Sequence, residues 1–424
     1  MTTYYEEREA ASVAERERAL FARLPEALEC ARQRAPAIAG QLQGVEVSNV
    51  CDRESLAAIP VIRKSELLQA QLSRRSNADA AAIPANERVF GGFSAIGWGE
   101  AARVFASPGP IYEPESFRSD YWGFARALHA AGFRRGELVH NCFSYHFTPA
   151  GSMMETAAHA LGCTVFPGGV GQTEQQVQVL ADLQPAGYTG TPSFLRIILE
   201  KADETDVAVT SLKRALFSGE AFPPSLRDWF LERGIDGYQA YGTADLGMIA
   251  YETSAREGLV VNEDIVLEIV RPGTGQPVPD GEVGEVVVTT LNPDYPLLRF
   301  GTGDLSAILP GQSPCGRGNL RIRGWLGRAD QTTKVRGMFV HPGQVAQIVA
   351  RHPDVQKARL VVAGAVGRDS MQLRIEVSNP SETLAEEVAQ SVREITKLRA
   401  DVDCVEPGAL PNDGKVIDDV RNYE

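Results

Sequence analysis

Residues 173–243 read TEQQVQVLADLQPAGYTGTPSFLRIILEKADETDVAVTSLKRALFSGEAFPPSLRDWFLERGIDGYQAYGT, and helical and strand patterns alternate along this stretch. The segments 173–185, 192–204 and 223–234 have the apolar spacing of helices, and a short apolar strand follows each of them. Helices that alternate with short buried strands predict a doubly wound, largely parallel α/β sheet. Because ligands of such sheets bind outside the carboxyl ends of the strands, we expect the chemistry in the loops that end them.

The sequence on either side predicts how the chain is divided. Residues 1–40 have the pattern of amphipathic helices, and residues 89–116 are rich in Gly, Ser and Pro. Residues 259–310 alternate apolar and polar residues between turns, which is typical of antiparallel hairpins. We therefore expect a large N-terminal domain over 1–328, with the parallel doubly wound sheet plus a β-hairpin region, and a small mobile α+β C-terminal domain over 331–424.

Composition and charge exclude several classes of protein. The chain has 424 residues, 43% of them hydrophobic and 23% charged, which is the ordinary mix of a globular protein. No apolar run approaches the ~18–20 residues that span a bilayer, so no membrane partner is expected. A net charge of −13 without a Lys/Arg cluster argues against a nucleic-acid partner. Six scattered cysteines and a charged N-terminal segment favour the cytoplasm. The oligomeric state stays open, a homodimer included.

Three motifs stand out: YGTADLG at 241–247, RFGTGD at 299–304 and GRADQTTKVRG at 327–337. In this order and at this spacing they resemble the adenylate-forming acyl/aryl-CoA ligases. The stretch from about residue 55 to the end is most similar to the phenylacetate–CoA ligase branch. Three further segments carry the same resemblance: VQVLADLQPAGYTGTPSF at 177–194, FSGEAF at 217–222 and PGALPNDGKVIDDVR at 407–421.

The resemblance implies a reaction with three substrates. A carboxylic acid would react with ATP to give an acyl-adenylate and pyrophosphate, and the acyl group would then pass to the thiol of coenzyme A. A carboxylate is a poor electrophile at neutral pH and is repelled by phosphate oxygens, so such a site must offset phosphate charge, hold the ribose and align the reactants.

Residue roles follow from the resemblance, position by position. Asp245 matches an acidic Mg²⁺ ligand, and Asp304 matches the carboxylate that accepts hydrogen bonds from both ribose hydroxyls. Lys415 matches the lysine placed at the bridging oxygen of the α-phosphate during adenylation. Asp330 matches the hinge about which the small domain swings. The other nucleotide contacts implied are Gly219, Glu220, Ala221, Tyr241, Gly242, Thr243 and Arg328.

The carboxylate pocket of the family falls at the strand pattern of residues 141–147, NCFSYHF. An aromatic slot is expected there, facing the methionines of the next helix. Its candidate residues are Phe143, Tyr145, His146, Phe147, Met153 and Met154. A core stripe is the alternative reading of the same residues. His146 is not expected to act as a base, because adenylation needs none.

One loop and one single residue differ from the pattern of the family. The phosphate loop of the family is a Ser/Thr/Gly-rich run ending in Gly-Lys-Pro, and here the matching residues 104–115 read VFASPGPIYEPE. This loop is degenerate: it lacks the lysine, its prolines remove N–H donors, and Glu113 would place a negative charge beside the polyphosphate. Gly301 stands where the family usually has a basic residue.

The leading interpretation is an ATP- and Mg²⁺-dependent ligase that activates a phenylacetate- or benzoate-like acid and transfers it to coenzyme A. One alternative is an adenylate-forming enzyme with another acceptor, an amine or a carrier thiol. The degenerate phosphate loop motivates a second alternative, a relative that does not adenylate or has no catalytic activity.

Overall fold

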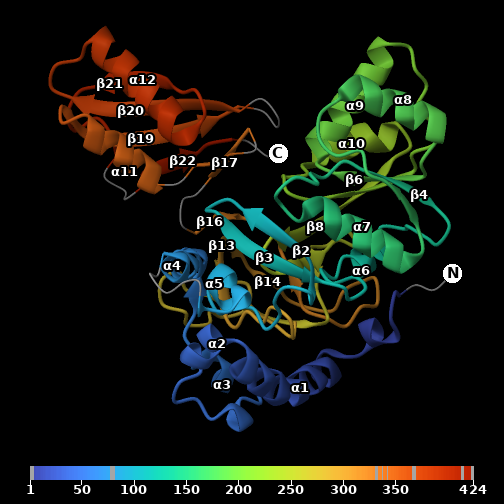
Figure 1. The fold of residues 1–424 in the computed structure, drawn as a ribbon. Helices are drawn as coiled ribbons and strands as arrows, with labels where there is room; N and C mark the ends of the chain where they lie inside the picture. The colour runs from blue at the N-terminus through green and yellow to red at the C-terminus, as the bar shows by residue number, and fades with distance from the viewer. Residues whose placement is uncertain are drawn as a thin grey trace. The chain divides into compact units, whose positions relative to one another are not determined.

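A computed structural model describes residues 4–76, 82–329, 333–336, 338–340, 342–364, 369–411 and 415–421. The chain forms two compact units, Met1–Gly327 and Arg328–Glu424, which are described separately (Figure 1). Across the described residues, no helix combines the length and the apolar composition needed to cross a membrane.

The N-terminal helices form a layer of their own in the first unit. Helix α1 (Val13–Arg34) begins at a capping box in which the Ser12 and Glu15 side chains bond each other's backbone N–H groups. Its buried face, with Leu24 and Leu28, packs on residues 295–300. The short helices that follow are α2 (Pro36–Gln41), α3 (Arg53–Ala57), α4 (Lys64–Arg75) and α5 (Ala85–Phe90), with 3₁₀ turns η1 (Glu7–Ala10) and η2 (Val47–Asn49).

The central sheet has nine strands in the order β14-β15-β10-β9-β8-β7-β6-β4-β5. Its parallel part, β5-β4-β6-β7-β8, is the predicted sheet, and β9, β10, β15 and β14 extend it antiparallel. The parallel strands are β4 (Leu138–Asn141), β5 (Thr164–Phe166), β6 (Gly187–Gly190), β7 (Arg214–Phe217) and β8 (Asp236–Thr243). The antiparallel strands are β9 (Gly247–Tyr251), β10 (Leu259–Val261), β14 (Ile308–Leu309) and β15 (Arg321–Ile322).

Helices cover both faces of the parallel strands (Figure 1). Because successive side chains of a strand point to opposite faces, β7 places Ala215 and Phe217 in one core cluster and Leu216 in another. The first cluster is completed by α8 (Thr173–Leu183), α9 (Pro192–Glu204) and α10 (Pro224–Glu232), and the second by α6 (Ala125–Ala130) and α7 (Ala150–Leu161). The predicted doubly wound arrangement is therefore confirmed.

A second sheet joins residues that lie far apart in the chain. Its order is β1-β13-β12-β11, and β12 (Gly284–Thr290) pairs antiparallel with both β11 (Ile265–Val270) and β13 (Phe300–Ser306). These are the predicted hairpin strands. Strand β1 (Ile62–Arg63) pairs parallel with β13, in the register Ile62 to Phe300 and Arg63 to Gly301. A separate hairpin is formed by β2 (Ala101–Ser107) and β3 (Ile111–Ser116).

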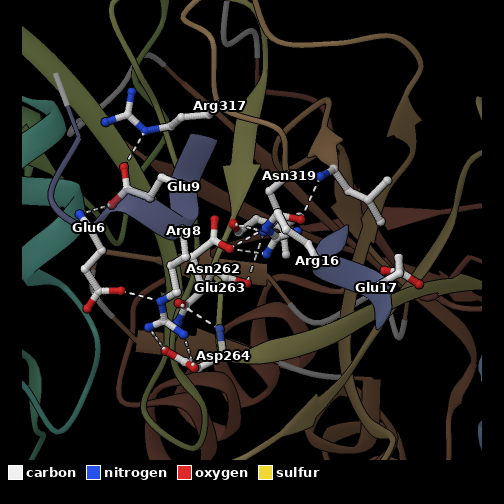
Figure 2. A network of polar contacts seen from close by, with 12 residues as sticks. Glu6, Arg8, Glu9, Arg16, Glu17, Asn262, Glu263, Asp264, Arg317 and Asn319 are labelled. Atoms are coloured by element: carbon white, nitrogen blue, oxygen red, sulfur yellow. Dashed lines mark hydrogen bonds and ion pairs between the residues drawn. The ribbon is translucent and has the colours of Figure 1, made fainter. Parts of the chain in front are cut away.

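A partly buried ionic network holds the first residues of the chain on this unit (Figure 2). The guanidinium of Arg8 donates two hydrogen bonds of 2.7 Å to the Asp264 carboxylate, and Arg16 pairs with Glu263. The carboxylate of Glu9 is fully buried and accepts a 2.9 Å hydrogen bond from Nε of Arg317. The network thus joins the N-terminal segment to the β10–β11 turn and to the loop before β15.

The second unit has the predicted α+β composition. Its four-stranded sheet has the order β21-β20-β19-β22, and α11 (Pro342–Arg351) and α12 (Glu382–Thr396) contribute Val345, Ile348, Val388 and Val392 to its core. The strands are β19 (Val355–Ala363), β20 (Ser370–Val377), β21 (Asp401–Val405) and β22 (Ile417–Asp419). Strands β17 (Thr333–Val335) and β18 (Met338–Val340) form a separate antiparallel pair. Strand β16 (Gly327–Arg328) spans the boundary between the two units in the sequence.

Candidate functional site

The loops expected to carry the chemistry follow three neighbouring strands. Strands β6, β7 and β8 are parallel and adjacent, so their carboxyl ends lie at the same edge of the sheet. After β7 the chain turns at Gly219, which has a φ of +79°, and Ser193 Oγ donates a 2.5 Å hydrogen bond to Glu220. Gly219 and Glu220 are exposed and Ala221 is partly buried, as a ligand-binding edge requires.

The end of β8 lies against the β13 strand. Gly242 has no room for a side chain, because an added Cβ would lie 2.6 Å from the carbonyl oxygen of Gly247. The hydroxyl of Thr243 accepts a 3.1 Å hydrogen bond from the Leu246 N–H and closes the turn. This turn holds Asp245 in a buried position, two residues before β9 begins.

Asp304 and Tyr241 contact each other. The Tyr241 hydroxyl donates a 2.8 Å hydrogen bond to Oδ2 of Asp304, and the Trp325 indole N–H donates one of 3.0 Å to Oδ1. The carboxylate is thus oriented by two donors while each of its oxygens keeps further acceptor capacity. The structure therefore brings together two of the predicted nucleotide residues and adds Trp325, which the motifs did not single out.

Asp245 forms an ion pair with a lysine that the sequence analysis missed. Lys64 Nζ lies 2.8 Å from Oδ2 of Asp245, whereas the buried Oδ1 has no hydrogen-bond partner among the described residues. A buried carboxylate oxygen without a partner is a suitable ligand for a divalent cation. No three His, Cys, Asp or Glu side chains of the described residues converge on a metal position. Asp245 therefore fits a Mg²⁺ ion that takes its other ligands from phosphate and water.

Glu113 differs from its expected role. The side chain is fully buried, and Ser107 Oγ donates a 2.5 Å hydrogen bond to it. Burial, and then the negative charge of Asp245, raise the pKa of Glu113 to about 8, against the effect of the Lys64 ammonium. The prediction that Glu113 presents its carboxylate to the polyphosphate is therefore not met, because the side chain is buried and burial favours its neutral form.

Gly301 adjoins a second missed cation. Arg63 pairs with the buried carboxylate of Glu285, and that carboxylate also accepts a 3.3 Å hydrogen bond from the Gly303 N–H. A Cβ at residue 301 would lie 2.8 Å from Oε1 of Glu285 and 3.1 Å from Nη1 of Arg63. The absence of a side chain at residue 301 therefore leaves room for this ion pair.

The expected acid pocket is divided between core and surface. Phe143, Met153 and Met154 are buried in the core cluster that α6 and α7 complete, while Tyr145 is partly buried and His146 is exposed. Phe147 is 81% exposed. The slot that these residues would form stays a prediction.

The strand expected over residues 141–147 is not formed, apart from Asn141. Strand β4 ends at Asn141, whose amide donates 2.8 Å hydrogen bonds to the Tyr145 hydroxyl and the Gly151 carbonyl. The Phe143 N–H donates to Oδ1 of the same side chain. These side-chain bonds replace strand pairing and turn the chain into a loop.

Three predicted residues belong to the C-terminal part of the chain. Lys415 is exposed, and its Nζ lies 3.2 Å from Oδ1 of Asp418. Arg328 is partly buried in β16. The predicted hinge, Asp330, lies outside the described residues.

Comparisons with known proteins find similar sequences over both parts of the chain. A family model described as AMP-binding enzyme matches residues 119–292, and one described as AMP-binding enzyme C-terminal domain matches residues 337–421. A phenylacetate-coenzyme A ligase of Thermus thermophilus is 33% identical over 330 residues, covering 73% of this chain and 74% of that protein. The enzyme of the same name from Escherichia coli is 29% identical over 353 residues, covering 76% and 80%.

Among solved structures, a 2-hydroxyisobutyryl-CoA ligase in complex with 2-HIB-AMP and CoA superposes with a TM-score of 0.81. That match has 25% identity and covers 100% of this chain and 93% of the ligase.

Proposed function

Because the chain belongs to the AMP-binding enzymes, in their phenylacetate–coenzyme A ligase branch, we propose that it activates an aromatic carboxylic acid and transfers it to coenzyme A. It is an acid–thiol ligase of the adenylate-forming kind. Enzymes of this family use ATP, Mg²⁺ and coenzyme A. The proposal is more specific than the family in one respect, namely that the acid is aromatic.

The first half-reaction joins the acid to AMP. A carboxylate oxygen attacks the α-phosphorus of ATP, a new P–O bond forms, and pyrophosphate leaves with the electrons of the broken bond. Asp304, oriented by Tyr241 and Trp325, would accept hydrogen bonds from the ribose hydroxyls. Asp245 would hold Mg²⁺, which when bound offsets phosphate charge. Lys415 is proposed to supply a cation at the bridging oxygen.

The second half-reaction releases AMP. The sulfur of coenzyme A attacks the acyl carbon of the adenylate, a thioester forms, and the C–O bond to AMP breaks. No base for the first step is needed, since the attacking carboxylate is already ionised at neutral pH. The acid would enter near residues 143–154, where apolar and aromatic side chains are abundant.

The observation that carries the proposal is the pair of buried carboxylates at one end of the sheet. Asp304 bonds to Tyr241 of β8, and Asp245 follows the same strand with one oxygen unpartnered among the described residues. One oriented carboxylate for a diol and one for a cation suit a magnesium–nucleotide complex.

Pyrophosphate release tests the proposal directly. Purified protein is incubated with Mg-ATP and a panel of phenylacetate-, benzoate- and 2-hydroxyisobutyrate-like acids, with and without coenzyme A, beside Lys415→Ala. We expect release with an aromatic acid, thioester formation with coenzyme A, and loss of release in the variant. Release with aliphatic acids alone would overturn the aromatic part, and no release with any acid would overturn the ligase reaction.

A further inference from the structure

Two consecutive cations, Arg63 and Lys64, enter the candidate site from β1 and the start of α4. The parallel pairing of β1 with β13 places Arg63 opposite Gly301, three residues before Asp304. Lys64 then reaches Asp245 at the end of the β8 turn. The junction of β1 and α4 therefore places one positive charge beside β13, which carries Asp304, and one beside Asp245.

In both ion pairs, Lys64–Asp245 and Arg63–Glu285, the carboxylate is buried and the cation is partly exposed. The side chain of Asp245 is 2% exposed and that of its partner Lys64 is 38% exposed. Glu285 is 1% exposed and its partner Arg63 is 35% exposed. In both pairs the buried anion faces the protein, whereas the cation reaches solvent. A negatively charged ligand that approaches this corner therefore meets the ammonium and the guanidinium first.

The β2–β3 hairpin has few cations of its own that could bind a polyphosphate. Arg103 is the one Lys or Arg in residues 101–116. Its guanidinium donates a 2.8 Å hydrogen bond to the buried carboxylate of Glu115, which also accepts bonds from Trp122 and Ser152. Arg103 is therefore engaged in holding the hairpin, and the hairpin brings no other cation to a polyphosphate.

We propose that Lys64 and Arg63 bind the β- and γ-phosphate oxygens of ATP, in place of a lysine on the hairpin. The proposal rests on the adenylating function proposed above. Phosphate oxygens and guanidinium or ammonium groups form charge-assisted hydrogen bonds, the strong class of such bonds. Lys64 carries its charge on a flexible stem, so Nζ can turn from Asp245 to a phosphate oxygen within the same corner. That movement would leave both Asp245 oxygens to a divalent cation.

Comparing the affinity for ATP with the affinity for AMP distinguishes binding of the β- and γ-phosphates from a structural role of Lys64 and Arg63. The affinities of ATP and AMP are measured by calorimetry for the wild type, Lys64→Gln and Arg63→Gln. Matched controls are Lys201→Gln and Arg53→Gln, because Lys201 and Arg53 are likewise partly exposed cations, and the carboxylates that they pair with are not candidate site residues. We expect each site variant to lose about tenfold or more in ATP affinity and less than about twofold in AMP affinity. The controls should change neither.

A second measurement uses the half-reaction that needs no polyphosphate. With a preformed acyl-adenylate and coenzyme A, both site variants should form thioester at the wild-type rate, although acid-dependent pyrophosphate release falls. Lys64→Arg keeps the charge and should recover most of the ATP affinity. If Lys64→Gln does not fold, Arg63→Gln carries the test, since Arg63 does not contact Asp245.

Equal losses for ATP and AMP, or none for either, would overturn the proposal. In that case the wild type still releases pyrophosphate, so the ligase function stands. A wild type that binds no ATP and releases no pyrophosphate would overturn the function and this inference together. The two failures are therefore distinguishable.

Discussion

The indole N–H of Trp325 donates a 3.0 Å hydrogen bond to Oδ1 of Asp304, the carboxylate expected to bind ribose. The second oxygen accepts from Tyr241, so two aromatic side chains fix the plane of one carboxylate. Trp325 lies two residues before the end of the first unit. The orientation of the Asp304 carboxylate therefore depends on a residue that lies close in sequence to the end of this unit.

Replacing Trp325 by Phe keeps an aromatic ring and removes the donor. We expect AMP affinity to fall about three- to tenfold, because the carboxylate loses one charge-assisted bond that orients it. Calorimetric titration with AMP measures the effect, and Trp98→Phe, at another exposed tryptophan, is the matched control. Tighter AMP binding in Trp325→Phe would contradict the positioning role and identify the indole as a competitor of the ribose.

Asp120 makes stability depend on pH. Burial raises the pKa of Asp120 from 3.8 to about 7, although the Ala125 N–H and the Arg126 guanidinium favour the charged form. Between these values the folded protein binds more protons than the unfolded chain, so this group's stabilising contribution decreases as pH rises from about 4 to about 7. Above that range the contribution of Asp120 is constant.

Asp120→Asn should therefore raise the urea concentration at the unfolding midpoint, relative to the wild type, by more at pH 8 than at pH 5, because the wild type loses stability between these two pH values. The amide oxygen can still accept the 3.1 Å bond from Ala125. Urea unfolding at both pH values measures the difference. An equal shift at both pH values would contradict the assigned titration.

Glu9 is the buried centre of the N-terminal network. Its carboxylate lies 2.9 Å from Arg317 and 3.5 Å from Arg126, and both guanidinium groups are themselves buried. Glu9→Gln removes the carboxylate paired with Arg317 and one of the carboxylates beside Arg126, so the free energy of unfolding should fall by about 3–5 kcal/mol. The exposed Glu7→Gln should change it by less than about 0.5 kcal/mol. A small loss in Glu9→Gln would show that the segment contributes little to folding.

Local sequence patterns predict most of the fold. The helices and strands of residues 173–243 were all predicted, because each carries its own period and its own turn residues. The family and the fold class are confirmed. Helix α6 begins only at Ala125, since the chain before it turns at Asp120 and Gly123, both with positive φ.

The two cations could not be found from sequence alone. The positions of Arg63 and Lys64 depend on β1 pairing with residues 300–301 and on the ion pair to Asp245, neither of which leaves a local pattern. The protonation of Glu113 likewise depends on what surrounds it once the chain is folded. Roles of single residues, Asp245, Asp304 and Lys415 among them, stay predictions until the variants are measured.

The pairing of Ile62 with Phe300 also sets an order of events during synthesis. The strands β4 to β8 leave the ribosome before residue 300, and can pair with one another as they emerge. Strand β1 must wait, since its partner is made far later, and closing so long a loop is slow. The corner that holds Arg63 and Lys64 is therefore assembled late, after the sheet beside it. A truncated chain that ends before β13 would lack the partner of β1, and therefore this corner.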